Sequence, residues 1–138
     1  MISGAVSRAS AGVLLVGGLG LLFAPDLVLP PIVPEYPPAG FWVGQLLGAA
    51  WLGLAALNWL NRFVLLGGIY GRGVVSANAI AYFITTLVLL RAGFGDPKAS
   101  GVWGIGVVAA LPALVYGWLL FRGPAEADLN AHRRQAGE

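Results

Sequence analysis

Polar side chains that could hold a ligand are few in this chain, and five of them fall within one short stretch of the sequence. They are Asn58, Asn61, Arg62, Tyr70 and Arg72. Two arginines can bind an anionic headgroup, and the amides and the phenol can add hydrogen bonds to it. These residues predict a headgroup site for a lipid or a quinone. The alternative is that the amides cap helix ends and the arginines only set the orientation in the membrane.

A second set of polar side chains lies inside apolar segments, where a hydrogen-bonding group prefers a protein partner. It comprises Gln45, Asn78, Tyr82 and Thr85. The last three are spaced by four and three residues, so they share one face of a helix. They either line a small cavity or bond to a neighbouring helix, which is worth ~0.6 kcal/mol per contact on average in a membrane. We expect interhelical polar contacts at these four residues.

The groups that most enzymes and pumps require are missing from the apolar segments. The chain has no cysteine and one histidine, His132, which lies in the polar tail. This excludes thiolate metal sites, iron–sulfur clusters and a haem held by two histidines in the membrane. Proton relays and coupled transport also need ionisable residues within the spans. We predict no catalytic residue, no metal site and no enzymatic activity, and a bound quinone is the one cofactor left open.

The elements that must position these residues are membrane-spanning helices. The chain has 138 residues, of which 58% are hydrophobic and 10% charged, whereas a soluble domain has about 25% charged residues. A segment of about 20 apolar residues crosses the ~30 Å of bilayer hydrocarbon as a helix. The prediction is an all-α fold, an antiparallel four-helix transmembrane bundle over residues 1–123, with a polar cytoplasmic tail at 124–138. The expected helices are 3–23, 40–61, 68–90 and 102–121.

The second of these segments carries the clearest pattern. Its small and polar residues recur at spacings of four and three, so they form one stripe: Gly44, Gly48, Trp51, Ala55, Asn58 and Arg62. Small residues let helix backbones approach closely in lipid, and a buried amide finds a partner there. We expect this stripe to face other helices. The opposite face, which includes Leu54 and Leu57, should meet lipid.

Two features surround the first helix. Residues 1–24 have the outline of a signal peptide, but Pro25 would follow the cleavage site directly, so we favour a retained helix. Six of the nine prolines lie between Pro25 and Pro38, which rules out a continuous helix there. This segment is either a polyproline ligand for a partner domain or a stiff lid over one end of the bundle. The lid is the favoured interpretation, because the segment is also apolar.

The arginines predict the orientation of the bundle. With four spans, both termini lie on one side, and six of the eight basic residues fall on that side. The positive-inside rule then places both termini in the cytoplasm. The net charge of +2 is too small to indicate a nucleic-acid partner. The six residues are Arg8, Arg62, Arg72, Arg122, Arg133 and Arg134, and the other two are Arg91 and Lys98.

Three stretches resemble a known family. They are LGLLFAPDLVLP at 19–30, GQLLGAAWLGLAALNWLNR at 44–62 and GGIYGRGVVSAN at 67–78. Together they resemble small bacterial four-helix membrane proteins of the DoxX-like superfamily. The resemblance implies a four-helix bundle in a bacterial inner membrane, and some members of the superfamily are associated with quinone-linked redox complexes. It supplies no catalytic residue for this chain.

The expected function follows from small-residue faces and from the absence of catalytic groups. We expect a non-enzymatic integral membrane protein that is an accessory or self-associating subunit. Its partners would be membrane lipids and either further copies of itself or a larger membrane complex. The alternative is a protein that binds a lipid or quinone at the headgroup site described above. A channel for a small neutral solute, which needs no charged residue, is the least favoured function.

Overall fold

The structure is a computed structural model that describes residues 2–95, 100–122, 130, 133 and 134. Within this part of the chain all regular structure is helical, and four helices are long and apolar enough to cross a membrane. The predicted all-α four-helix transmembrane fold is thus confirmed. The predicted polar tail lies mostly outside the described residues. The elements are α1 (Ile2–Phe23), α2 (Pro25–Val28), η1 (Pro38–Gly40), α3 (Phe41–Leu60), α4 (Arg72–Gly95) and α5 (Ser100–Arg122).

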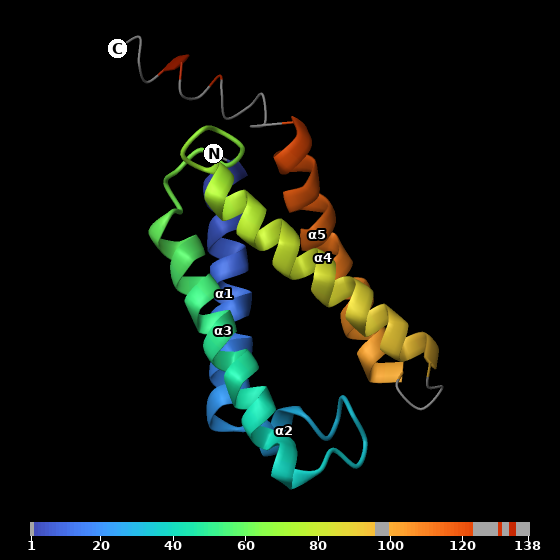
Figure 1. Cartoon of the computed structure of the whole chain (residues 1–138). Helices are drawn as coiled ribbons and strands as arrows, with labels where there is room; N and C mark the ends of the chain where they lie inside the picture. The colour runs from blue at the N-terminus through green and yellow to red at the C-terminus, as the bar shows by residue number, and fades with distance from the viewer. Residues whose placement is uncertain (1, 96–99, 123–129, 131–132, 135–138) are drawn as a thin grey trace.

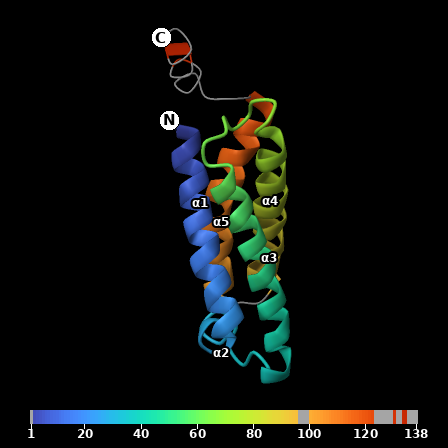
Figure 2. The same cartoon turned by 90° about the vertical axis from the view of Figure 1, so that its left-hand side faces the viewer.

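The four long helices form two antiparallel pairs. Helix α1 packs along α3, and α4 packs along α5, whereas few contacts join α3 to α4. Figure 1 shows that the pairs meet at one end of the molecule and diverge toward the other. In Figure 2, viewed from the side of α1 and α3, all four helices run along a common direction. The end where the pairs meet holds the start of α1, the α3–α4 connection and the end of α5, and we call it the N-terminal end of the bundle.

Glycines bring α1 and α3 into close contact. A Cβ atom on Gly48 would lie 2.8 Å from the carbonyl oxygen of Gly18, and one on Gly18 would lie 3.0 Å from the carbonyl oxygen of Gly48. At the preceding residue of α1, a Cβ on Gly17 would lie 2.6 Å from the Trp51 ring. The indole therefore fills the space that a missing side chain leaves on the opposite helix. This is the close backbone approach that small residues allow in lipid.

Four of the six residues of the predicted stripe are buried, whereas Trp51 and Arg62 are half-buried and Arg62 lies beyond the end of α3. Gly44, Gly48, Ala55 and Asn58 are the buried residues of this helix. The leucine face, however, does not meet lipid along its whole length. Leu57 packs against the hydrophobic core and Leu54 is half-buried, because this side of α3 turns toward the second helix pair near the N-terminal end of the bundle.

Helix α4 begins at Arg72, later than the predicted residue 68, because the glycines before it form consecutive turns. Gly67 has a φ of 86°, a backbone conformation that glycine adopts readily. The Gly68 amide donates to the Leu65 carbonyl at 3.1 Å, and the Gly71 amide donates to the Gly68 carbonyl at 3.0 Å. Gly71 also lies so close to the Leu65 carbonyl that a Cβ there would overlap it. The segment from Gly67 to Gly71 is thus a compact reversal.

The same helix ends at Gly95, beyond the predicted residue 90. Packing against α5 explains the extension. A Cβ on Gly93 would lie 2.8 Å from the Trp103 side chain, and the rings of Phe94 and Trp103 meet edge to face at 6.1 Å. Such tertiary contacts outweigh the low helix propensity of the glycines in this last turn.

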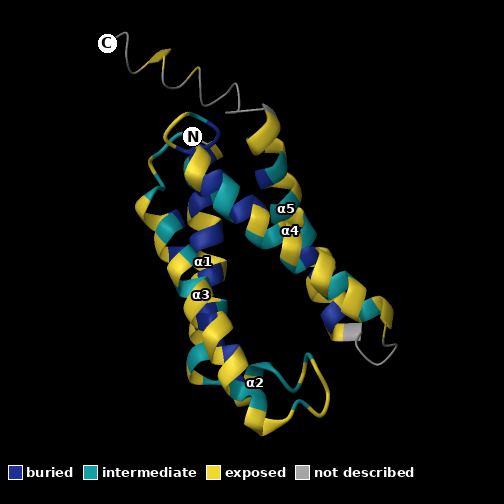
Figure 3. Cartoon of the chain, viewed as in Figure 1, coloured by how far each residue is buried: buried dark blue, intermediate teal, exposed yellow. Residues whose placement is uncertain are grey.

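The hydrophobic core is small and lies where the two pairs meet. Leu66, Val75 and Tyr116 are fully buried in it, and Val6 of α1 packs against it. Large apolar residues are exposed on all four long helices, and Figure 3 shows many exposed residues along the faces of α3 and α4 that are turned to the viewer. This distribution fits a protein whose outer surface contacts lipid or other membrane helices.

At the opposite end, the proline-rich connection folds back onto the helices. Leu29 lies over Gly44, where a Cβ would be 2.8 Å from the leucine Cδ1. The Ile32 backbone lies beside Gly101 at the start of α5, so the connection reaches from the first helix pair to the second. The Tyr36 hydroxyl donates to the Gly40 carbonyl at 3.1 Å, which closes the segment. These contacts agree with the interpretation of this segment as a lid.

Candidate functional site

Among the residues that the structure describes, two buried asparagines are the most strongly hydrogen-bonded. Asn58 of α3 and Asn78 of α4 are fully buried and face each other. The Asn58 Nδ2 donates to the Asn78 Oδ1 at 2.9 Å, and the Asn78 Nδ2 donates to the Asn58 Oδ1 at 3.0 Å. Each amide also donates to a carbonyl one turn back in its own helix, that of Leu54 and that of Val74. Both NH₂ groups are therefore fully used.

A tyrosine and a serine extend this pair to the other two helices. The Tyr116 hydroxyl of α5 lies 3.1 Å from the Asn58 Oδ1 and 2.9 Å from the Ser10 Oγ of α1. The amide oxygen can only accept, so the tyrosine donates its one proton to it and accepts a hydrogen bond from the Ser10 hydroxyl. We call these four residues the polar network. It takes one side chain from each long helix and holds the two pairs together at the N-terminal end of the bundle.

The polar network has little capacity left for a ligand. The Asn58 Oδ1 accepts two hydrogen bonds, which is its full capacity, and Asn58, Asn78 and Tyr116 are all fully buried. A polar group that is satisfied inside a membrane protein stabilises the packing of its helices. The polar network therefore joins the four helices through interhelical hydrogen bonds.

Sequence reasoning missed half of this network. Tyr116 and Ser10 were not among the predicted interhelical residues, although Asn78 was. A signal was present, because Ala109, Ala113 and Tyr116 are spaced by four and three residues and thus lie on one helix face. The spacing predicts that Tyr116 points into the bundle. It does not say which residue the hydroxyl meets.

A further buried hydroxyl lies one turn from Ser10. Ser7 is fully buried, and its Oγ has no hydrogen-bond partner among the described residues. A buried hydroxyl without a partner costs about 1–3 kcal/mol by protein mutational data. Ser7 thus reduces the stability of the site where the two pairs meet.

The remaining predicted interhelical residues differ in what they contact. The Gln45 Nε2 of α3 donates to the Leu22 carbonyl of α1 at 3.2 Å. The Tyr82 ring stacks on the Tyr116 ring, with centroids 5.9 Å apart. Thr85 is half-buried and forms no side-chain hydrogen bond with any described residue. The neighbouring Thr86 is buried and donates to the Tyr82 carbonyl one turn back at 2.8 Å.

The five residues of the predicted headgroup site do not form one pocket. Asn58 belongs to the polar network inside the bundle. The Asn61 Nδ2 donates to the Leu57 carbonyl at 2.8 Å and so satisfies a carbonyl near the end of α3. The Arg62 Nη1 donates to the Trp59 carbonyl at 2.7 Å. Its guanidinium lies over the rings of Trp59 and Phe63, 4.5 and 4.4 Å from their centroids.

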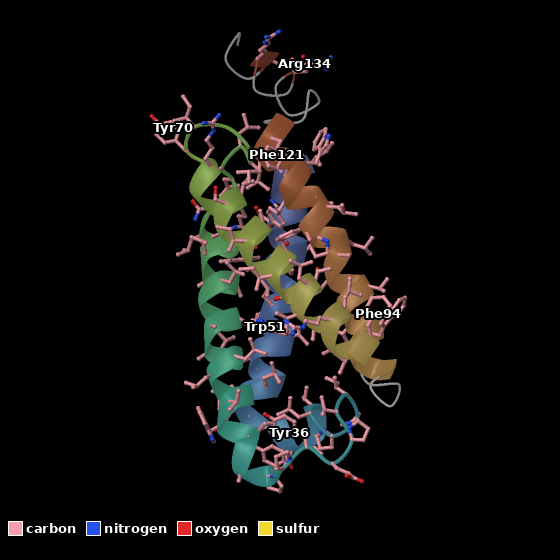
Figure 4. All side chains as sticks on the ribbon, turned by 45° about the vertical axis from the view of Figure 1, so that its right-hand side comes forward. Tyr36, Trp51, Tyr70, Phe94, Phe121 and Arg134 are labelled. Atoms are coloured by element: carbon pink, nitrogen blue, oxygen red, sulfur yellow. The ribbon has the colours of Figure 1, made fainter. Side chains whose placement is uncertain are left out.

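The other two predicted residues lie on the surface. Tyr70 is 90% exposed, and Figure 4 shows it at the same end of the molecule as Phe121. Arg72 is exposed and is the first residue of α4. It forms no hydrogen bond or ion pair with any residue that the structure describes. All the N–H donors of the Arg72 guanidinium are therefore available to an anion, whereas one nitrogen of Arg62 already donates within the protein.

Helices α4 and α5 also leave a groove between them on the outer surface. Its volume is about 270 Å³ and its lining is almost entirely apolar. The lining residues include Ala79, Ile80 and Phe83 from α4, and Ala113, Gly117 and Phe121 from α5.

Comparison with known proteins adds no family and no relative. No protein-family model matches this chain, and neither a curated protein nor a solved structure is significantly similar to it. Within the described residues, no three histidine, aspartate or glutamate side chains are grouped so that they could hold a metal ion.

Proposed function

We propose that this chain is a non-enzymatic integral membrane protein that acts through helix–helix association, as a self-associating or accessory subunit. One observation carries the proposal. The face of α3 that points away from α1 bears the small residues Ala49, Gly53 and Ala56, and all three are exposed. A Cβ on Gly53 would meet no atom within 4 Å.

This exposed face and the buried face of the same helix both carry small residues. Between α1 and α3, Gly18 and Gly48 allow a close approach of the two backbones. In lipid, association depends on such packing, because lipid tails are as apolar as leucine and no hydrophobic force drives helices together. Ala49, Gly53 and Ala56 offer a second helix the same geometry. We therefore propose that a helix of another copy, or of a partner subunit, packs there.

Cysteine crosslinking tests this proposal well, because the natural chain contains no cysteine. Ala49→Cys and Ala50→Cys form a matched pair. Both alanines are exposed, and they point about 100° apart around the helix. We expect oxidation in native membranes to link Ala49→Cys into a dimer, or to a second polypeptide, and to leave Ala50→Cys largely monomeric. Monomer alone at both positions, or equal crosslinking at both, would contradict the proposal.

The orientation and the membrane are part of the same proposal. We propose that the N-terminal end of the bundle faces the cytoplasm of a bacterial cell, in line with the DoxX-like resemblance. Arg8, Arg62 and Arg72 belong to this end and Arg91 to the other, which agrees with the positive-inside rule. A membrane-impermeant maleimide added to intact cells should then label Val33→Cys and spare Tyr70→Cys. The reverse pattern would invert the topology.

The alternative function, a headgroup site built from all five predicted residues, has weaker support. Asn58 uses its polar atoms within the polar network, and Arg62 donates from Nη1 to the Trp59 carbonyl while its guanidinium lies over two rings. Arg72 is exposed, and its guanidinium is available to an anion at the surface.

A further inference from the structure

Arg72, which is not bound to any described residue, lies on α4 in line with the groove between α4 and α5. Arg72 and Ala79 are seven residues apart, so they lie on nearly the same line along α4, about 10 Å apart along the helix axis. Ala79 lines the groove. Arg72 is exposed and is not bound to any described residue, unlike Arg62, whose guanidinium contacts Trp59 and Phe63.

The position of these features in a bilayer decides what would occupy the groove. Arg72 begins a membrane-spanning helix, so its guanidinium lies at the level of the lipid headgroups. The α4 wall of the groove starts about two helical turns deeper, at Ala79, while its α5 wall extends from Ala113 to Phe121, near the end of that helix. A basic residue at the membrane surface attracts anionic headgroups. The charge and the depth together complement a lipid with an anionic head and an apolar tail.

The groove lining favours a flexible chain over a rigid helix. Ile80, Phe83 and Phe121 are bulky and exposed, and bulky side chains keep two helix backbones apart. The exposed face of α3 differs in part, since its middle carries the small residues Ala49, Gly53 and Ala56 between the larger exposed Leu46 and Leu60. An acyl chain can pass between the bulky side chains of the groove and reach Gly117, where a Cβ would meet no atom within 4 Å.

We propose that this groove binds one acyl chain of an anionic phospholipid whose phosphate is held by Arg72. The site is separate from the α3 face on which the proposed association depends. It also differs from the five-residue headgroup site, because Asn58, Asn61 and Arg62 take no part in it. The protein would thus select lipids by charge at this groove.

Native mass spectrometry of the full-length protein in mild detergent tests this site. Phosphatidylglycerol and phosphatidylcholine with identical acyl chains are added in equal amounts, and the bound fraction of each is measured. We expect the wild type to retain phosphatidylglycerol preferentially. Arg72→Gln should lower the ratio of the two lipids about fivefold, from the attraction of one basic residue for an anionic surface. Arg91→Gln, near the other end of α4, is the control and should leave the ratio unchanged.

Filling the groove tests the acyl-chain half of the proposal. Gly117→Leu should abolish retention of phosphatidylglycerol by occupying the groove. Gly104→Leu is the matched control, because Gly104 lies on the same helix and a Cβ there also meets no atom within 4 Å. It should retain the lipid as the wild type does. Wild-type retention in Gly117→Leu, or an unchanged lipid ratio in Arg72→Gln, would overturn the proposal. Arg72→Gln changes only an exposed side chain, so this arm does not depend on how Gly117→Leu folds.

Discussion

Asn58 and Asn78 bind each other through both of their amide groups, at 2.9 and 3.0 Å, and so join the two helix pairs. A reciprocal amide pair of this kind needs both helices in one rotation and one register, because a shift of one residue would turn either side chain away. The pair therefore determines how α3 and α4 face each other, although few other contacts connect these two helices.

The amide pair predicts a non-additive effect of mutation. Asn58→Leu leaves the Asn78 amide and the Tyr116 hydroxyl without their partner, so we expect a loss of about 1–2 kcal/mol in the free energy of unfolding. Asn78→Leu should act similarly. The double variant should lose less than the sum of the two, because no orphaned amide remains. Unfolding in bicelles by a denaturing detergent measures all three. Strict additivity would show that the two side chains do not interact.

The hydroxyl of Tyr116 should contribute to the free energy of unfolding separately from its ring. Tyr116→Phe removes the contacts with Ser10 and Asn58 but keeps a ring that can stack on Tyr82. Polar contacts in membrane proteins are worth ~0.6 kcal/mol on average and up to ~1.7, so we expect a loss in that range in the same unfolding experiment. Tyr70→Phe is the control and should be neutral, because Tyr70 is 90% exposed. Equal effects of the two substitutions would argue against a buried role for the Tyr116 hydroxyl.

Two of the three buried serines of α1, Ser7 and Ser10, predict opposite effects. Ser7→Ala removes a buried hydroxyl that has no partner among the described residues, so the free energy of unfolding should rise by about 1–3 kcal/mol. Ser10→Ala should lower it, because the Tyr116 hydroxyl loses a bond. Thermal unfolding of both variants in one detergent compares them directly. A loss of stability in Ser7→Ala would mean that its hydroxyl is bonded in the membrane.

Two glycines of α3, Gly48 and Gly53, should differ in how an added methyl group changes the free energy of unfolding. A methyl group on Gly48 would lie 2.8 Å from the Gly18 carbonyl oxygen and 3.0 Å from the Leu22 nitrogen, both backbone atoms that cannot move aside alone. Gly48→Ala should therefore cost about 1–3 kcal/mol through overpacking. Gly53→Ala meets no atom within 4 Å and should be neutral or slightly stabilising in the monomer. Thermal unfolding at low protein concentration measures both, and similar values would disprove the close approach of α1 and α3.

The sequence by itself determined the membrane-spanning helices and the buried face of α3. Helix formation and span length depend on local composition, and the spacing of Gly44, Gly48, Ala55 and Asn58 follows from 3.6 residues per turn. The exact start of α4 was less accessible, because the turns before Arg72 depend on how Gly67 and Gly71 accommodate the backbone around Leu65.

The tertiary structure alone decided which helices pair and which polar groups meet. The hydroxyls of Ser10 and Tyr116 bond across 106 residues of sequence, and no periodicity within one helix can identify such a partner. The same holds for the groove, whose two walls come from α4 and α5, and for the availability of Arg72 when Arg62 is already engaged. Periodicity shows which side of a helix is buried; the choice of what covers that side depends on packing between helices distant in the sequence.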